Sequence, residues 1–109
     1  MPTITPLEFS FGAVVTDIAL SHMNEHEWHA VEDAFHKYAA LVFPGQYLTE
    51  DQQITFGERF GEIELLRPDP TKKAVPISNL KDDGTPFRPE EARFKTLRGN
   101  EGWHTDSSY

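Results

Sequence analysis

The chain has 109 residues, a formal net charge of −8 and no cysteine. The negative charge argues against a nucleic acid partner, and the lack of cysteine excludes disulfides, thiolate catalysis and Cys-ligated metals, so that a metal must be held by His, Asp or Glu. At this length we expect one domain at most. Since no stretch is apolar for long enough to cross a membrane and the N-terminus lacks the regions of a signal peptide, we expect a cytoplasmic protein.

The N-terminal third predicts two strands and a helix. Residues Thr3–Leu7 and Phe11–Ile18 have strand patterns and are expected to pair, with Gly12 at a turn or bulge. Asn24 followed by Glu27 resembles a capping box, and it opens a helix that runs to about Tyr38. The expected apolar face of this helix consists of Trp28, Val31, Phe35 and Tyr38.

Four histidines in or beside this helix could be interpreted as a metal cluster: His22, His26, His29 and His36. At helical spacing, the last three share with Asp33 the face opposite the apolar side chains. A solvated polar face accounts for this placement by periodicity alone. A ligand role is the alternative.

The middle of the chain predicts a buried strand, a second helix and two further strands. The continuous apolar run Ala39–Phe43 indicates the buried strand. Thr49 and Gln52 form a second capping-box pattern, which opens a helix through about Phe60 that Gly61 terminates. The side chains expected to be buried in it are Ile54, Phe56 and Phe60. The further strands are expected at residues 62–66 and 75–80, the latter at a sheet edge because of Pro76.

Residues 81–86 are expected to form a turn, and residues 85–102 are polar, contain prolines and show no clear period. A loop of this length inside a small domain is usually functional or disordered. Its place just before the candidate ligands described next predicts a mobile active-site loop. A mobile surface excursion is the alternative.

The segment from Trp103 to Tyr109 carries the candidate metal ligands. His104 and Asp106 are two residues apart, so that on an extended strand both side chains project from one face. An imidazole and a carboxylate suit Fe(II), which in the two-His-one-carboxylate oxygenases takes one further His. By itself His-x-Asp is a weak motif. The alternative is a surface strand end whose two side chains hydrogen-bond each other.

Four blocks of sequence, in this order, resemble the taurine dioxygenase family of Fe(II)- and 2-oxoglutarate-dependent oxygenases: residues 11–15, 41–46, 52–62 and 103–106. Residues 77–79 and Ser107-Ser108 look more like the 2,4-dichlorophenoxyacetate dioxygenase branch than like taurine dioxygenase itself. The resemblance implies an α+β, mainly β fold, the N-terminal portion of a double-stranded β-helix (jelly-roll) with two flanking helices.

The resemblance also implies the roles of the site residues. His104 and Asp106 would be two of the three iron ligands, Asn100 and Ser107 would lie beside the substrate, and Trp103 would help to orient these groups. The protein would use dioxygen to hydroxylate a small anionic substrate, and 2-oxoglutarate would yield succinate and CO2. Where the taurine branch has a His that holds the sulfonate stands Leu66, which argues against taurine. The nine bases in residues 59–109, against one in residues 1–58, favour anionic substrates in the second half.

The distal His ligand, the Arg that pairs with 2-oxoglutarate and most of the jelly-roll core are absent from this sequence. We therefore expect residues 1–109 to be a single incomplete domain that is inactive alone. One alternative is a non-catalytic half-domain that binds a partner or forms a homo-oligomer through β edges. The other is a His/Asp metallohydrolase with Zn(II) or Mn(II) and an activated water. Dependence on 2-oxoglutarate separates this hydrolase from the oxygenase.

Overall fold

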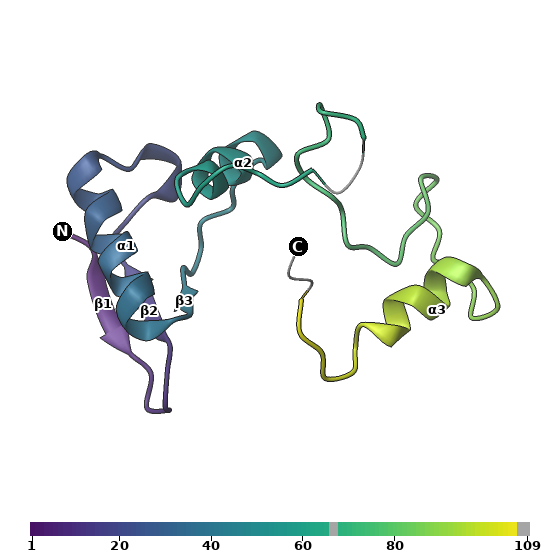
Figure 1. The fold of residues 1–109 in the computed structure, drawn as a ribbon, viewed down its shortest axis with the longest axis horizontal. Coiled ribbons are helices and arrows are strands. Elements are labelled where there is room, and N and C mark those ends of the chain that lie inside the picture. The colour runs from purple at the N-terminus through teal and green to yellow at the C-terminus, as the bar shows by residue number, and fades with distance from the viewer. Residues whose placement is uncertain (66–67, 107–109) are drawn as a thin grey trace. The chain divides into compact units, whose positions relative to one another are not determined.

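The computed structural model describes residues 1–65 and 68–106 and divides into two compact units, Met1–Ala74 and Val75–Tyr109 (Figure 1). The first unit contains β1 (Thr3–Pro6), β2 (Ala13–Thr16), the short 3-10 helix η1 (Leu20–His22), α1 (Glu25–Tyr38), β3 (Leu41–Val42) and α2 (Glu50–Glu58). The second contains α3 (Ala92–Gly99). The chain is thus α+β, as predicted. Among the helices in the described ranges, none has the length and apolar character needed to span a membrane.

β2 is the central strand of a three-stranded sheet with the order β1-β2-β3. It pairs antiparallel with β1, where Ile4 faces Val15, and parallel with β3, where Ala13 faces Leu41. Two parallel neighbours need a crossover connection, and α1 supplies it (Figure 1). The predicted pairing of the first two strands is therefore confirmed.

Gly12 ends the turn between β1 and β2, as its place in the sequence predicted. Its φ is +98°, and a Cβ there would lie 2.8 Å from Cδ1 of Leu7. The N–H of Gly12 donates to the carbonyl of Tyr38 at 2.8 Å, and that of Ala13 to the carbonyl of Ala40 at 3.0 Å. Because only glycine adopts this backbone conformation without strain, the turn can hold the start of β2 against the end of α1.

α1 begins at the predicted capping box. Asn24 Oδ1 accepts from the Glu27 N–H, and Glu27 Oε2 accepts from the Asn24 N–H, both at 2.9 Å. The helix contacts β2 and β3 and buries Trp28, Val31 and Ala34. Val31 of α1 and Val15 of β2 are fully buried, so the core lies between this helix and the sheet.

Aromatic rings join α1 to the end of α2. The ring of Phe60 lies edge-on to those of Trp28 and Phe35, with centroids 5.0 and 5.4 Å apart. Phe35 and Phe60 nevertheless remain 39% and 46% exposed, and α2 has no fully buried residue. The prediction of burial is therefore wrong for Phe60, which is exposed, while Ile54 and Phe56 are half-buried.

An ion pair reinforces the same contact. Arg59 stacks on the Trp28 ring, 4.8 Å from its centroid, and its Nη2 lies 2.9 Å from Oε1 of Glu25. The hydrogen bond from Arg59 holds the pKa of the Glu25 carboxyl below its ordinary value. The first turn of α1 is thus tied to the residue that caps α2.

The structure differs from the sequence predictions where a strand lacks a neighbour. Residues 62–65 and 75–79 form no strand, and Leu80 makes only an isolated bridge with Pro86. Strands form through repeated backbone hydrogen bonds to a neighbour, and within the described residues these two segments make only one such bond, from the Phe87 N–H to the Asn79 carbonyl. The strand expected over residues 39–43 is observed only as β3, at the edge of the sheet. Val42 of β3 is 51% exposed, so this strand is not buried as predicted.

The ends of the later helices also differ from prediction. α2 ends at Glu58 with Arg59 as its C-cap, so Gly61 lies two residues beyond the cap rather than ending the helix. α3 lies within residues 85–102, which were expected to be a loop. Ala, Arg, Lys and Leu are strong helix formers, but without an apolar period their pattern does not reveal a helix.

The Gln46 side chain connects its own loop to the residues at and before η1, and replacing it should lower the stability of the protein. Oε1 accepts from the Leu20 N–H at 2.9 Å, and Nε2 donates to the Ile18 carbonyl at 3.1 Å. Because Gln46→Leu leaves both part-buried backbone groups without this partner, we expect it to lower the free energy of unfolding by about 2 kcal/mol in urea denaturation of the full-length protein. Gln53→Leu, at an exposed position of α2, should stay within about 0.5 kcal/mol of wild type. Equal effects of the two changes would contradict the role of Gln46.

Candidate metal centre

The two candidate ligands follow α3 on an irregular segment. The strand predicted for them is not observed over residues 103–106. Nevertheless, Nε2 of His104 and Oδ1 of Asp106 lie 3.5 Å apart, so the two side chains face each other. Neighbouring donor atoms around a metal are about 3 Å apart when each bond is about 2.1 Å long. The pair therefore fits a shared cation with little adjustment.

A backbone contact orients the His104 ring. Nδ1 lies 2.8 Å from the carbonyl oxygen of Gly102. Because a carbonyl can only accept, the neutral ring carries its proton on Nδ1 and keeps the lone pair of Nε2 toward Asp106. Ligand histidines commonly have their tautomer fixed in this way. The chemistry of the pair thus suits a metal that binds neutral imidazole and carboxylate.

The structure gives less support to the other predicted site residues. Asn100 is the exposed C-cap of α3, and its N–H donates to the Leu97 carbonyl at 3.2 Å. The Trp103 side chain is fully exposed and does not cover the ligand pair. Ser107 and Leu66 lie outside the described residues. The structure therefore brings together His104 and Asp106, with Gly102 as a contact that the sequence analysis missed.

No group of three or more His, Cys, Asp or Glu side chains within residues 1–65 and 68–106 is arranged to hold a metal. The histidines of α1, His26, His29 and His36, are exposed, as is Asp33. That is the exposure expected for the solvated helix face predicted from periodicity. The His104–Asp106 pair remains the candidate centre.

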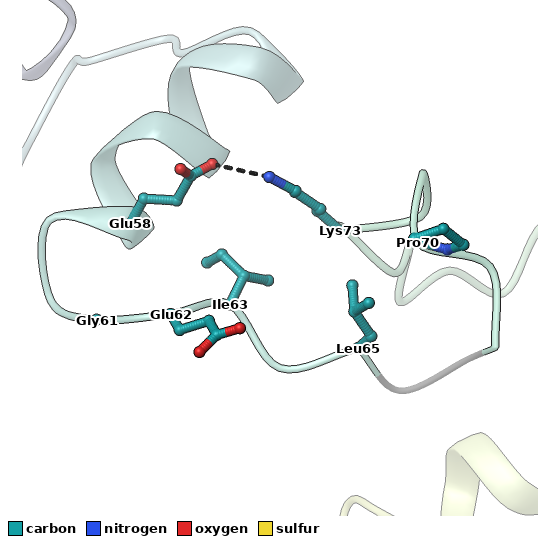
Figure 2. Close-up of a pocket in the computed structure, with 7 residues that line it drawn as sticks. All are labelled: Glu58, Gly61, Glu62, Ile63, Leu65, Pro70 and Lys73. Carbon is teal, nitrogen blue, oxygen red and sulfur yellow. Dashed lines mark hydrogen bonds and ion pairs between the residues drawn. The ribbon is translucent and has the colours of Figure 1, made fainter.

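A hollow of about 380 Å³ lies in the first unit, beside the end of α2. Its lining residues are Glu58, Gly61, Glu62, Ile63, Leu65, Pro70 and Lys73. Figure 2 shows Lys73 reaching Glu58, whose Oε1 is 3.5 Å from Nζ. Its size suits a small molecule, although two carboxylates against one ammonium disfavour an anion. Its formation depends on how the chain folds back after α2, which no local pattern in the sequence indicated.

Comparison with known proteins identifies the family. The profile described as "Taurine catabolism dioxygenase TauD, TfdA family" matches residues 3–109. The (S)-phenoxypropionate/alpha-ketoglutarate-dioxygenase of Sphingobium herbicidovorans is 42% identical over 109 residues, covering 97% of this chain and 35% of the relative. The alpha-ketoglutarate-dependent 2,4-dichlorophenoxyacetate dioxygenase of Cupriavidus pinatubonensis is 34% identical over 113 residues, covering 95% and 39%.

The fold agrees with this assignment. The crystal structure of AAD-2 in complex with Mn(II) and N-oxalylglycine has a TM-score of 0.85 and 33% sequence identity, covering 99% of this chain and 37% of that chain. The chain thus spans little more than a third of the length of these relatives. The family predicted from four sequence blocks is confirmed, and the chain belongs to the taurine catabolism dioxygenase TauD, TfdA family.

Proposed function

We propose that this chain is part of an Fe(II)- and 2-oxoglutarate-dependent dioxygenase that hydroxylates a small anionic substrate of the aryloxy acid class, with release of succinate and CO2. The observation that carries the proposal is the facing pair of His104 Nε2 and Asp106 Oδ1, 3.5 Å apart. Support for the substrate class comes from relatives named for phenoxypropionate and 2,4-dichlorophenoxyacetate.

His104 and Asp106 would hold the iron as two of three protein ligands, and a further His outside these residues would complete the set. When bound, the iron and 2-oxoglutarate supply the oxidant that dioxygen chemistry requires. The protein residues supply geometry. The Gly102 carbonyl keeps the His104 Nε2 lone pair free, and Asp106 contributes the negative charge that a divalent cation prefers.

The remaining predicted residues would serve the substrate. Asn100 lies four residues before His104 and would contact the substrate from the end of α3. Ser107 would line the same space, and Trp103 would orient the ligands. In the complete fold, the β1-β2-β3 sheet with α1 and α2 would form the N-terminal portion of a jelly-roll. Residues 85–102, which include α3, would form the mobile segment at the active site.

The charge of α3 supports an anionic substrate. The helix sequence Ala-Arg-Phe-Lys-Thr-Leu-Arg-Gly has three basic residues and no acidic one. Arg93, Lys95 and Arg98 are exposed, and they make no ion pair within the described part of the chain. Unpaired positive charges near a site raise the local concentration of anions. Both 2-oxoglutarate and an aryloxy acid are anions, so these charges would raise the local concentration of each.

The proposal is tested by product analysis with the full-length protein. We expect succinate to form in proportion to oxidised phenoxypropionate, and only when Fe(II), 2-oxoglutarate and dioxygen are all present. Replacement of Fe(II) by Zn(II) should stop the reaction, because zinc has no redox chemistry. Substrate turnover that proceeds with Zn(II) and without 2-oxoglutarate would instead establish the metallohydrolase.

A further inference from the structure

A small hairpin precedes α3 in the second unit. The Phe87 N–H donates to the Asn79 carbonyl at 2.8 Å, and the Lys81 N–H donates to the Thr85 carbonyl at 2.7 Å. At its tip, Asp83 Oδ1 accepts from the Thr85 hydroxyl at 2.6 Å and from the Thr85 N–H at 2.9 Å. These bonds, the hydroxyl bond most of all, hold the pKa of the Asp83 carboxyl below its ordinary value. The segment is therefore an ordered hairpin with Lys81 on one arm.

Lys81 reaches from this hairpin to the start of α3. Its Nζ lies 2.8 Å from Oε1 of Glu91, and the two side chains are 35% and 30% exposed. In the other Lys–carboxylate pair of the described residues, Lys73–Glu58, the distance is 3.5 Å and the exposures are 46% and 47%. The Phe87 ring, with its centroid 5.9 Å from Nζ, lies beside the ammonium. A shorter and better covered ion pair is less weakened by water.

Glu91 is the N-cap residue of α3, and its carboxylate makes no capping bond of its own. Its carbonyl accepts from the Lys95 N–H at 3.3 Å, which begins the helix. No residue of α3 is fully buried, and only Phe94 and Leu97 are half-buried, so packing fixes the direction of the helix only weakly. Among the described residues, the Lys81–Glu91 ion pair is therefore the contact best placed to anchor the helix.

The other end of α3 leads directly to the candidate ligands. The N–H groups of Asn100 and Glu101 donate to the carbonyls of Leu97 and Arg98, both at 3.2 Å, and continue the helix as a turn. The next residue, Gly102, accepts from the His104 ring. A change in the direction of α3 would displace Gly102 and His104 together.

We propose that Lys81 and Glu91 are positioning residues of the metal centre, whose ion pair fixes the start of α3 and thereby the place of His104. The inference rests on the proposed function and adds to it two residues that do not touch the metal or the substrate. A displacement of about 1 Å at a reacting centre can cost about a hundredfold in rate, so a partial loosening should cost about tenfold.

The first test is amide hydrogen exchange of the full-length, metal-free protein, which does not depend on activity. We expect Lys81→Met to speed exchange in residues 92–99 about tenfold. Lys72→Met is the matched control, because it removes the same charge from an exposed position outside α3 without breaking an ion pair of the described residues, and it should leave exchange in residues 92–99 unchanged. Equal exchange in wild type and Lys81→Met would overturn the inference.

The second test measures Mn(II) affinity and kcat in the same variants. Lys81→Met and Glu91→Gln should each weaken Mn(II) binding and lower kcat about tenfold, and the double variant should lose no more than either single one. Faster exchange with unchanged Mn(II) affinity and kcat would overturn the positioning role and leave a purely structural ion pair. A wild-type protein without 2-oxoglutarate-dependent turnover would refute the proposed function, while exchange and Mn(II) binding would still decide the role of the pair.

Discussion

His104→Ala should lower succinate release by the full-length protein at least about 100-fold. Removing a group that only supports a metal ligand typically lowers metal affinity or activity about 10- to 100-fold, and removing the ligand itself should lower them at least as much. The expected cause is loss of iron, since Asp106 alone cannot hold the cation as an imidazole–carboxylate pair does. The measurement is succinate production together with the iron content of the purified protein.

His29→Ala is the control for this experiment. His29 is exposed on α1 and belongs to the histidine group for which the sequence left a metal-ligand role as an alternative. Its replacement should leave iron content and succinate release at the wild-type level. Iron-dependent turnover that persists in His104→Ala, or disappears in His29→Ala, would mean that the metal centre has been assigned to the wrong residues.

Trp28→Ala should produce the largest loss of stability in the first unit. The Trp28 side chain is 5% exposed, its ring contacts Phe60 at 5.0 Å, and the Arg59 guanidinium lies 4.8 Å from it. Truncation of a buried aromatic side chain removes these contacts and leaves a cavity, at a cost of about 3–5 kcal/mol. Urea denaturation of the full-length protein, followed by far-ultraviolet circular dichroism, measures it.

Phe9→Ala serves as the comparison, because Phe9 is 83% exposed. A change at such a position should alter the free energy of unfolding by no more than about 0.5 kcal/mol. If Trp28→Ala and Phe9→Ala had the same effect, the contact between α1, α2 and the sheet would contribute nothing to the core, contrary to the burial described above.

Features of the fold with a local signal could be predicted from the sequence. The capping box of Asn24 and Glu27 and the turn glycine Gly12 work through residues a few positions away, so pattern and geometry agree. The strands expected at residues 62–66 and 75–80 depended on neighbours that no local pattern specifies. α3 was missed because its residues, although strong helix formers, show no apolar period.

The candidate site shows the same division. The spacing of His104 and Asp106 singled them out as a pair, and their side chains lie 3.5 Å apart although the strand expected there does not form. The contact between His104 and Gly102 was not predictable, since it depends on the turn that follows α3. Family membership followed from four separated blocks that no single motif could have established.

The sheet of the first unit also has a consequence for biosynthesis. All three of its strands lie within residues 3–42, so every hydrogen bond between them is available once β3 has been translated. At a ribosomal rate of about 5–20 residues per second, His104 follows β3 by about 3–12 s. Hairpins and helices form within microseconds. The nascent chain can therefore complete this sheet well before its first candidate iron ligand is synthesised, and under the proposed function iron binding would be a late step in maturation.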